Sequence, residues 1–116
     1  MTQRGSMNMT IALTGPVSTF FEAERTQDVE ALARCFSEHA TVRDEGRTIE
    51  GPDAIKRWMK EAKAKYHHTV EPLGVSHRDG LTVVTARVAG AFPNSPLDLQ
   101  YLFAVEGGKI VSLEIR

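Results

Sequence analysis

Apolar residues in the first half of the chain recur at the three- and four-residue spacing of amphipathic helices. A first helix is predicted from Gly15-Pro16, because proline suits a first helical turn, to the polar break at 26–28. Asp28 is the expected N-cap of a second helix, which should end near His39, a cation compatible with the helix dipole. A third helix, entered at Gly51-Pro52, carries the apolar stripe Ile55, Trp58, Met59, Ala62 and Tyr66, opposite a solvated face of Lys56, Arg57, Lys60, Glu61, Lys63 and Lys65.

The second half of the chain loses the helical period and predicts strands separated by turns. Residues 68–77 form an irregular strand that contains a proline and a glycine, which favours an edge or bulged position. Residues 81–92 are rich in β-branched side chains and predict a central strand. Strands at 98–105 and 110–115 are joined by a turn at 106–109. Three helices followed by an antiparallel sheet predict the α+β class.

One short strand, Thr41 to Gly46, is predicted between the second and third helices. Alternate side chains of a strand share a face, so Val42 and Asp44 point the same way. If that face lines a pocket, burial raises the pKa of Asp44 toward values useful for proton transfer. The competing interpretation is that Asp44, followed by Glu-Gly, only forms a turn.

Both faces of the last two strands are apolar. Leu99, Tyr101 and Phe103 lie on one face of their strand, whereas Leu102 and Ala104 lie on the other. Three helices can cover one face of such a sheet, and the open face then needs another partner. We therefore expect a homodimer that forms through the open sheet face.

Length and charge narrow the class of protein. A chain of 116 residues fits one domain with its own core, for which we expect residues 9–116, after a flexible leader at 1–8. The formal net charge is −1, from 14 basic and 15 acidic residues. Such a balance gives no electrostatic signal for binding to nucleic acid or to an anionic membrane, so neither is expected as a partner.

The cysteine and histidines limit redox and metal chemistry. Cys35 is the only cysteine, which excludes an internal disulfide and suits a reducing cytoplasm. No stretch predicts a signal peptide or a membrane span, so we expect a cytoplasmic protein. The four histidines lack the spacing of a metal site, and no metal or cofactor is expected.

Three segments, taken in order, resemble a known family. They are D-V-E-A-L-A-R-C-F-S-E-H-A-T-V-R-D-E-G, then I-E-G-P-D-A-I, then V-E-G-G-K-I-V-S-L-E-I. From about Val17 to Arg116 the chain resembles the SnoaL-like branch of the nuclear transport factor two-like superfamily, which includes polyketide cyclases and ketosteroid isomerases. The resemblance implies a cone-shaped, curved, mixed or antiparallel sheet wrapped around the three helices, with an apolar pocket inside.

The resemblance also implies roles for individual residues. Asp44 matches the position of an aspartate that shuttles a proton between carbons of an enolisable ketone. The family's first-helix tyrosine falls on Phe20, which has no hydroxyl, and its late-strand acid falls on Gln100 or Tyr101. Losing one oxyanion donor typically costs ~100- to 1,000-fold in turnover. Steroid isomerase activity itself is therefore not expected.

The resulting hypothesis is a protein that binds a small hydrophobic molecule and moves a proton with Asp44 as base, in an isomerase- or cyclase-type reaction. One alternative is a non-catalytic ligand-binding or dimerising module. Another is a hydratase or dehydratase, which needs a second ionisable residue beside Asp44. Besides Asp44, the residues expected to line the pocket are Phe20, Phe36, Val42, Trp58, Met59, His68, Tyr101 and Phe103.

Overall fold

The computed structural model describes residues 13–116, and the predicted leader at 1–8 lies outside the described residues. Within 13–116, no helix is long and apolar enough to cross a membrane. The elements of this range are three helices and six strands, which confirms the α+β class. In order they are α1 (Gly15–Thr26), α2 (Val29–Arg34), β1 (Phe36–Asp44), β2 (Arg47–Glu50), α3 (Pro52–Tyr66), β3 (Thr69–Arg78), β4 (Leu81–Ala89), β5 (Leu97–Glu106) and β6 (Lys109–Ile115).

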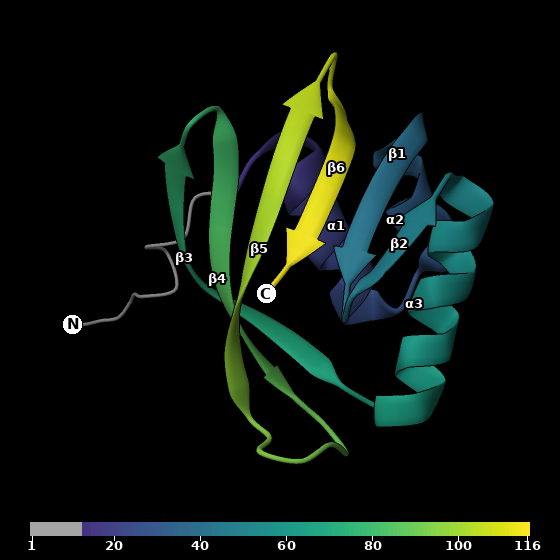
Figure 1. The fold of residues 1–116 in the computed structure, drawn as a ribbon, viewed down its shortest axis with the longest axis vertical. Helices are drawn as coiled ribbons and strands as arrows, with labels where there is room; N and C mark the ends of the chain where they lie inside the picture. Colours follow the sequence, from purple (N-terminus) through teal and green to yellow (C-terminus); the bar gives the residue numbers. More distant parts are fainter. Residues whose placement is uncertain (1–12) are drawn as a thin grey trace.

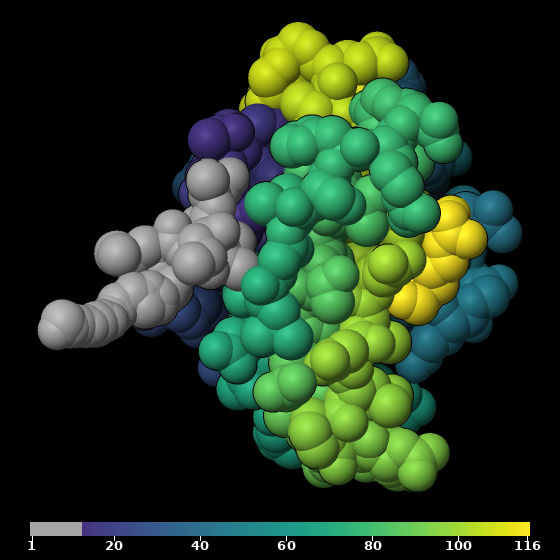
Figure 2. All heavy atoms as spheres, turned by 90° about the vertical axis from the view of Figure 1, so that its left-hand side faces the viewer, coloured from purple at the N-terminus to yellow at the C-terminus, as the bar shows by residue number. Residues whose placement is uncertain are grey.

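The strands form one curved sheet in the order β2-β1-β6-β5-β4-β3. Neighbouring strands are antiparallel except β1 and β6, which are parallel, so the sheet is mixed. The helices pack on one face, with α1 against β3 and β6 and with α3 against β1 and β2 (Figure 1). β3 is an outer strand of the sheet, where the proline and glycine predicted it, and this side of the molecule faces the viewer in Figure 2. Its ladder with β4 shifts register between Pro72 and Gly74, as a bulged edge strand requires.

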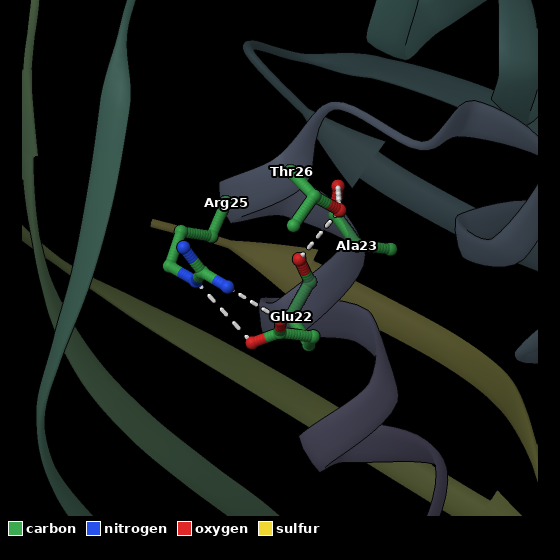
Figure 3. Close-up of polar contacts among 4 residues, drawn as sticks. All are labelled: Glu22, Ala23, Arg25 and Thr26. Atoms are coloured by element: carbon green, nitrogen blue, oxygen red, sulfur yellow. Dashed lines mark hydrogen bonds and ion pairs between the residues drawn. The ribbon is translucent and has the colours of Figure 1, made fainter.

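The core lies between the helices and the concave face of the sheet. Phe20 of α1 is fully buried there, and its ring centroid lies 5.3 Å from that of Phe103. The outer side of α1 is polar, and Figure 3 shows its last turn, where Glu22 pairs with Arg25. The Thr26 hydroxyl donates to the Glu22 carbonyl oxygen at 3.0 Å, and the helix ends at Thr26, as the sequence predicts.

Four elements differ from the sequence-based expectation, namely α2, β1, β2 and β4. The second helix ends at Arg34, and Phe36 begins β1 by pairing with Ile110 of β6. His39 is therefore an exposed strand residue, and the prediction that it ends a helix is wrong. The strand β2 was not predicted, because only one of its four residues, Ile49, is buried and no alternating pattern can develop.

The chain turns sharply where β4 ends, at Ala89 rather than at the predicted residue 92. A Cβ atom at Gly90 would lie 2.7 Å from the Tyr66 carbonyl oxygen and 2.9 Å from the Cα and Cβ atoms of His68. The Ala91 amide donates to the same Tyr66 oxygen at 2.7 Å. Only glycine allows the loop after β4 to approach the start of β3 this closely.

Candidate functional site

A cavity of about 300 Å³ lies beneath the concave face, between α1, α3 and the loop that joins β4 to β5. Most of its wall is apolar, and four aromatic side chains contribute to it: Trp58, Tyr66, Phe92 and Tyr101. The ionisable side chains on the wall, apart from the tyrosines, are Glu24, Asp44, Glu45 and His68. An apolar cavity with a few convergent polar groups is the usual form of a small-molecule site.

Asp44 is the last residue of β1 and lies on the same face as the fully buried Val42. The Trp58 indole Nε1 donates a hydrogen bond to Asp44 Oδ2 at 3.1 Å. Burial raises the pKa of Asp44, and the hydrogen bond from Trp58 offsets this only in part. The arrangement therefore provides an oriented carboxylate of raised basicity at the cavity wall.

Tyr101 faces the cavity from β5, whereas Gln100 is exposed on the opposite face of that strand. The ambiguity left by the sequence is thereby resolved in favour of the tyrosine. Phe20 and Phe21 pack on its ring, with centroid distances of 6.1 and 5.4 Å. Burial, followed by the negative charges of Glu24 and Asp44, raises the pKa of Tyr101 well above its usual range. The hydroxyl thus stays protonated and can donate a hydrogen bond.

A buried polar cluster beside the cavity was not predicted from the sequence. Glu24 of α1 is 2% exposed and forms an ion pair with Lys63 of α3. His68 Nε2, at the start of β3, lies 3.7 Å from Glu24 Oε2. Burial alone would raise the pKa of Glu24, but His68 and Lys63 outweigh it and hold that pKa below its usual value. The cluster therefore keeps a carboxylate ionised inside the core.

The sequence carried a signal for this cluster. Glu24 follows Phe20 by four positions and Phe21 by three, so a charged residue falls on the apolar face of α1. Lys63 was assigned to the solvated face of α3, and that assignment is wrong, because its side chain is only 13% exposed. Its carbon chain is buried while its ammonium reaches Glu24.

The residues predicted to line the pocket divide into two groups. Those that line the cavity are Asp44, Trp58, Met59, His68 and Tyr101. Those that do not line it are Phe20, Phe36, Val42 and Phe103, which are buried in the core. The rings of the three phenylalanines pack edge to face, with Phe20 between Phe36 and Phe103. They fill space inside the sheet that the resemblance had assigned to the pocket.

The other histidines take no part in the cavity wall. His39, His67 and His77 are all exposed. Within residues 13–116, no group of three or more histidine, cysteine, aspartate or glutamate side chains is arranged to hold a metal ion. The chemistry that the wall's own side chains offer is proton transfer and hydrogen bonding.

Comparison with known families and solved structures shows which proteins share this fold. Residues 17–113 match the family model described as a SnoaL-like domain. A candidate polyketide cyclase from Sinorhizobium meliloti is 38% identical, with 90% of this chain and 95% of that chain covered and a TM-score of 0.86. Comparison with curated protein sequences gave no match.

Two more distant structures share the fold alone. A protein with a ketosteroid isomerase-like fold from Catenulispora acidiphila, solved in complex with trimethylamine, is 19% identical, with 90% of this chain and 86% of that chain covered and a TM-score of 0.77. SalBIII, an epoxide hydrolase/cyclase-like enzyme with a role in pyran ring formation in salinomycin, is 22% identical. The alignment with SalBIII covers 86% of this chain and 85% of that chain, and the TM-score is 0.73.

Proposed function

This chain belongs to the family of SnoaL-like domains, and from that premise we propose that it binds a small hydrophobic carbonyl compound and moves a proton with Asp44 as general base. The observation that carries the proposal is the position of Asp44, whose carboxylate borders an apolar cavity and has a raised pKa. A base is most effective when its pKa approaches the working pH. The cavity volume of about 300 Å³ favours a compact ligand.

The proposed step is enolisation. The Asp44 carboxylate takes a proton from the carbon next to the ligand's carbonyl group. The electrons of that C–H bond form a C=C bond, and negative charge moves to the carbonyl oxygen, which accepts a hydrogen bond from the Tyr101 hydroxyl. Asp44 then returns the proton, either to another carbon or to an oxygen of the ligand. Trp58 holds the carboxylate in place through its indole N–H.

A cyclase-type outcome is the version of this step that the comparisons favour, because the structure with 38% identity is described as a candidate polyketide cyclase. In that version the enolate carbon attacks a second carbonyl carbon of the same molecule. One C–C bond forms, and the second carbonyl oxygen takes up the proton that Asp44 removed. The apolar wall excludes water, which would otherwise protonate the enolate before the ring closes.

The experiment measures deuterium uptake from D₂O at the carbons next to the carbonyl of 2-tetralone, a compact bicyclic ketone, by NMR. Asp44→Asn is expected to lower the enzymatic exchange rate by ~100- to 10,000-fold, the usual contribution of a general base. Glu38→Gln is the matched control, because Glu38 is an exposed carboxylate on the same strand and outside the cavity wall. Binding of the ketone with no exchange above the Asp44→Asn level would identify a ligand carrier and refute the catalytic proposal.

We also propose that the protein forms a homodimer through the convex face of the sheet. The apolar side chains that stay partly exposed there are Leu81 of β4 and Ala104 of β5, on either side of the cross-strand pair Val83 and Leu102, which is buried within the single chain. Sedimentation velocity at micromolar concentration is expected to give a dimer, and Ala104→Glu should dissociate it by placing a charge in the contact. A monomeric wild-type protein would contradict the proposal.

A further inference from the structure

We propose that His68 is a second hydrogen-bond donor for the ligand's oxygen, acting through its Nε2–H in a neutral tautomer that Glu24 selects. This role rests on the proposed function and deepens it, because it identifies a group that stabilises the negative charge on the ligand's oxygen after Asp44 has removed a proton. The first-helix position that the resemblance assigned to a tyrosine holds Phe20, which cannot donate. One helical turn later Glu24 lies near His68, so the donor comes from the residue that precedes β3 instead.

The two oxygens of Glu24 meet two different groups. Oε1 pairs with the Lys63 ammonium, and Oε2 lies 3.7 Å from His68 Nε2. A buried carboxylate is costly unless charged or donating groups surround it, and Lys63 supplies the compensating charge. Lys63 therefore balances the charge of Glu24, and Nε2 of the imidazole faces a carboxylate that is already paired.

The surroundings of the two imidazole nitrogens fix which one carries the proton. His68 Nδ1 is sealed from solvent and has no hydrogen-bond partner among the described residues. A proton on Nδ1 would be a buried donor without an acceptor, which is unfavourable. A proton on Nε2 points toward the negative charge of Glu24 instead. The neutral imidazole is thus expected as the Nε2–H tautomer.

The Nε2–H group is oriented but not saturated. A separation of 3.7 Å from Glu24 Oε2 is too long for a good hydrogen bond, so the proton remains available to a stronger acceptor. An enolate oxygen is such an acceptor. His68 lines the same cavity as Asp44 and Tyr101; it directly precedes β3, whereas Asp44 lies on β1 and Tyr101 on β5. Together the His68 and Tyr101 donors make an oxyanion site. The family's usual first-helix donor is absent here, because Phe20 holds that position and has no hydroxyl group.

The backbone holds His68 rigidly enough for this role. Lys63 Nζ donates to the His68 carbonyl oxygen at 2.8 Å, so the residue that neutralises Glu24 also anchors the start of β3. Gly90 packs directly on His68 Cα and Cβ and leaves no space for a shift in that direction. The imidazole faces Glu24 of α1 and the ring of Tyr66 of α3, whose centroid lies 6.4 Å away, and it shares the cavity wall with Asp44 of β1.

The tautomer is tested first, without any substrate. Two-bond ¹⁵N–¹H correlation spectra of the ¹⁵N-labelled protein are recorded at about pH 8.5, roughly two units above the ordinary histidine pKa. His68→Gln identifies the His68 signals by their loss. The expected spectrum shows the proton on Nε2. Glu24→Gln should transfer part of the population to Nδ1, whereas Glu22→Gln, an exposed residue of the same helix, should change nothing. A wild-type His68 protonated on Nδ1 overturns the proposal.

The donor role is tested by the exchange of 2-tetralone. His68→Leu is expected to lower the exchange rate roughly 100-fold, as for the loss of one oxyanion donor, and His68→Gln should recover most of it through its amide N–H. His77→Leu is the matched control, because His77 lies on β3, the strand that His68 precedes, and is exposed and outside the cavity wall. Exchange that depends on Asp44 but is unchanged in His68→Leu refutes this inference alone. Absence of exchange in the wild type refutes the proposed function, while the tautomer experiment still decides the role of Glu24.

Discussion

Lys63→Met isolates the energetic role of the buried cluster. Methionine fits the buried carbon chain of Lys63, which is 13% exposed, but removes the charge that compensates Glu24, which is 2% exposed. Breaking a buried ion pair by removing one partner typically destabilises a protein by ~3 to 5 kcal/mol, because the other charge is left uncompensated. The variant also removes the hydrogen bond to the His68 carbonyl oxygen. We therefore expect the free energy of unfolding at neutral pH to fall by about 3 kcal/mol or more.

The pH dependence gives this prediction a distinct signature. In the wild-type protein the pKa of Glu24 is held below its usual value, despite burial, by His68 and Lys63. A depressed pKa in the folded state adds stability above the unfolded carboxyl pKa of about 4.3, and that stability is lost as the pH falls through the folded value. Without Lys63, burial raises the pKa of Glu24, so protonation at low pH should relieve part of the destabilisation of the variant.

The assay is urea unfolding of wild type, Lys63→Met and Lys60→Met at about pH 8 and pH 5, on either side of a raised carboxyl pKa. Lys60 is exposed on the same helix, and its substitution should change the stability by less than about 0.5 kcal/mol. The loss caused by Lys63→Met should be larger at the higher pH. Equal stabilities for the two variants, or a loss that does not depend on pH, would refute the assignment of Lys63 as the partner of a buried, ionised Glu24.

Two further substitutions test the geometry of the site. Asp44→Asn should raise the melting temperature at neutral pH, because a carboxyl group with a raised folded-state pKa destabilises the protein once it is ionised; calorimetry at about pH 3, where the carboxyl is protonated, should show no such gain. Gly90→Ala should destabilise the fold by ~1 to 3 kcal/mol, because its Cβ would lie 2.7 Å from the Tyr66 carbonyl oxygen; an unfolding curve that matches the wild type would contradict that close approach.

The candidate site was partly visible in the sequence. The period-two alternation of a strand placed Asp44 on the same face as Val42, and only local information was needed for that inference. The choice between Gln100 and Tyr101 required the register of β5 in the sheet, since a shift by one residue exchanges the two faces. The resemblance located the proposed base, but it did not indicate which buried residues fill the core and which line the cavity.

Local physical rules were sufficient where the signal was strong within one element. Proline at the start of α1 and α3, the Asp28 cap of α2 and the bulged edge strand β3 all follow from the backbone preferences of single residues. Where two structures suited the same residues, the sequence was not sufficient. The apolar spacing that ends at Phe36 fits a helix, yet the parallel pairing with β6 provides backbone hydrogen bonds and makes that residue the start of β1.

The amino-acid sequence by itself thus determined the class of fold, most element boundaries and the position of Asp44 on an inward face, because each depends on periodicity or on the conformational limits of one residue. Only the tertiary structure decided which polar groups share the cavity wall with Asp44. Glu24 of α1 is distant in the sequence from Lys63 of α3 and from His68, which follows α3, and their charges and hydrogen bonds have meaning only after α1 has packed against that part of the chain. Electrostatic partnership depends on distance and burial, and neither is a property of the chain until it folds.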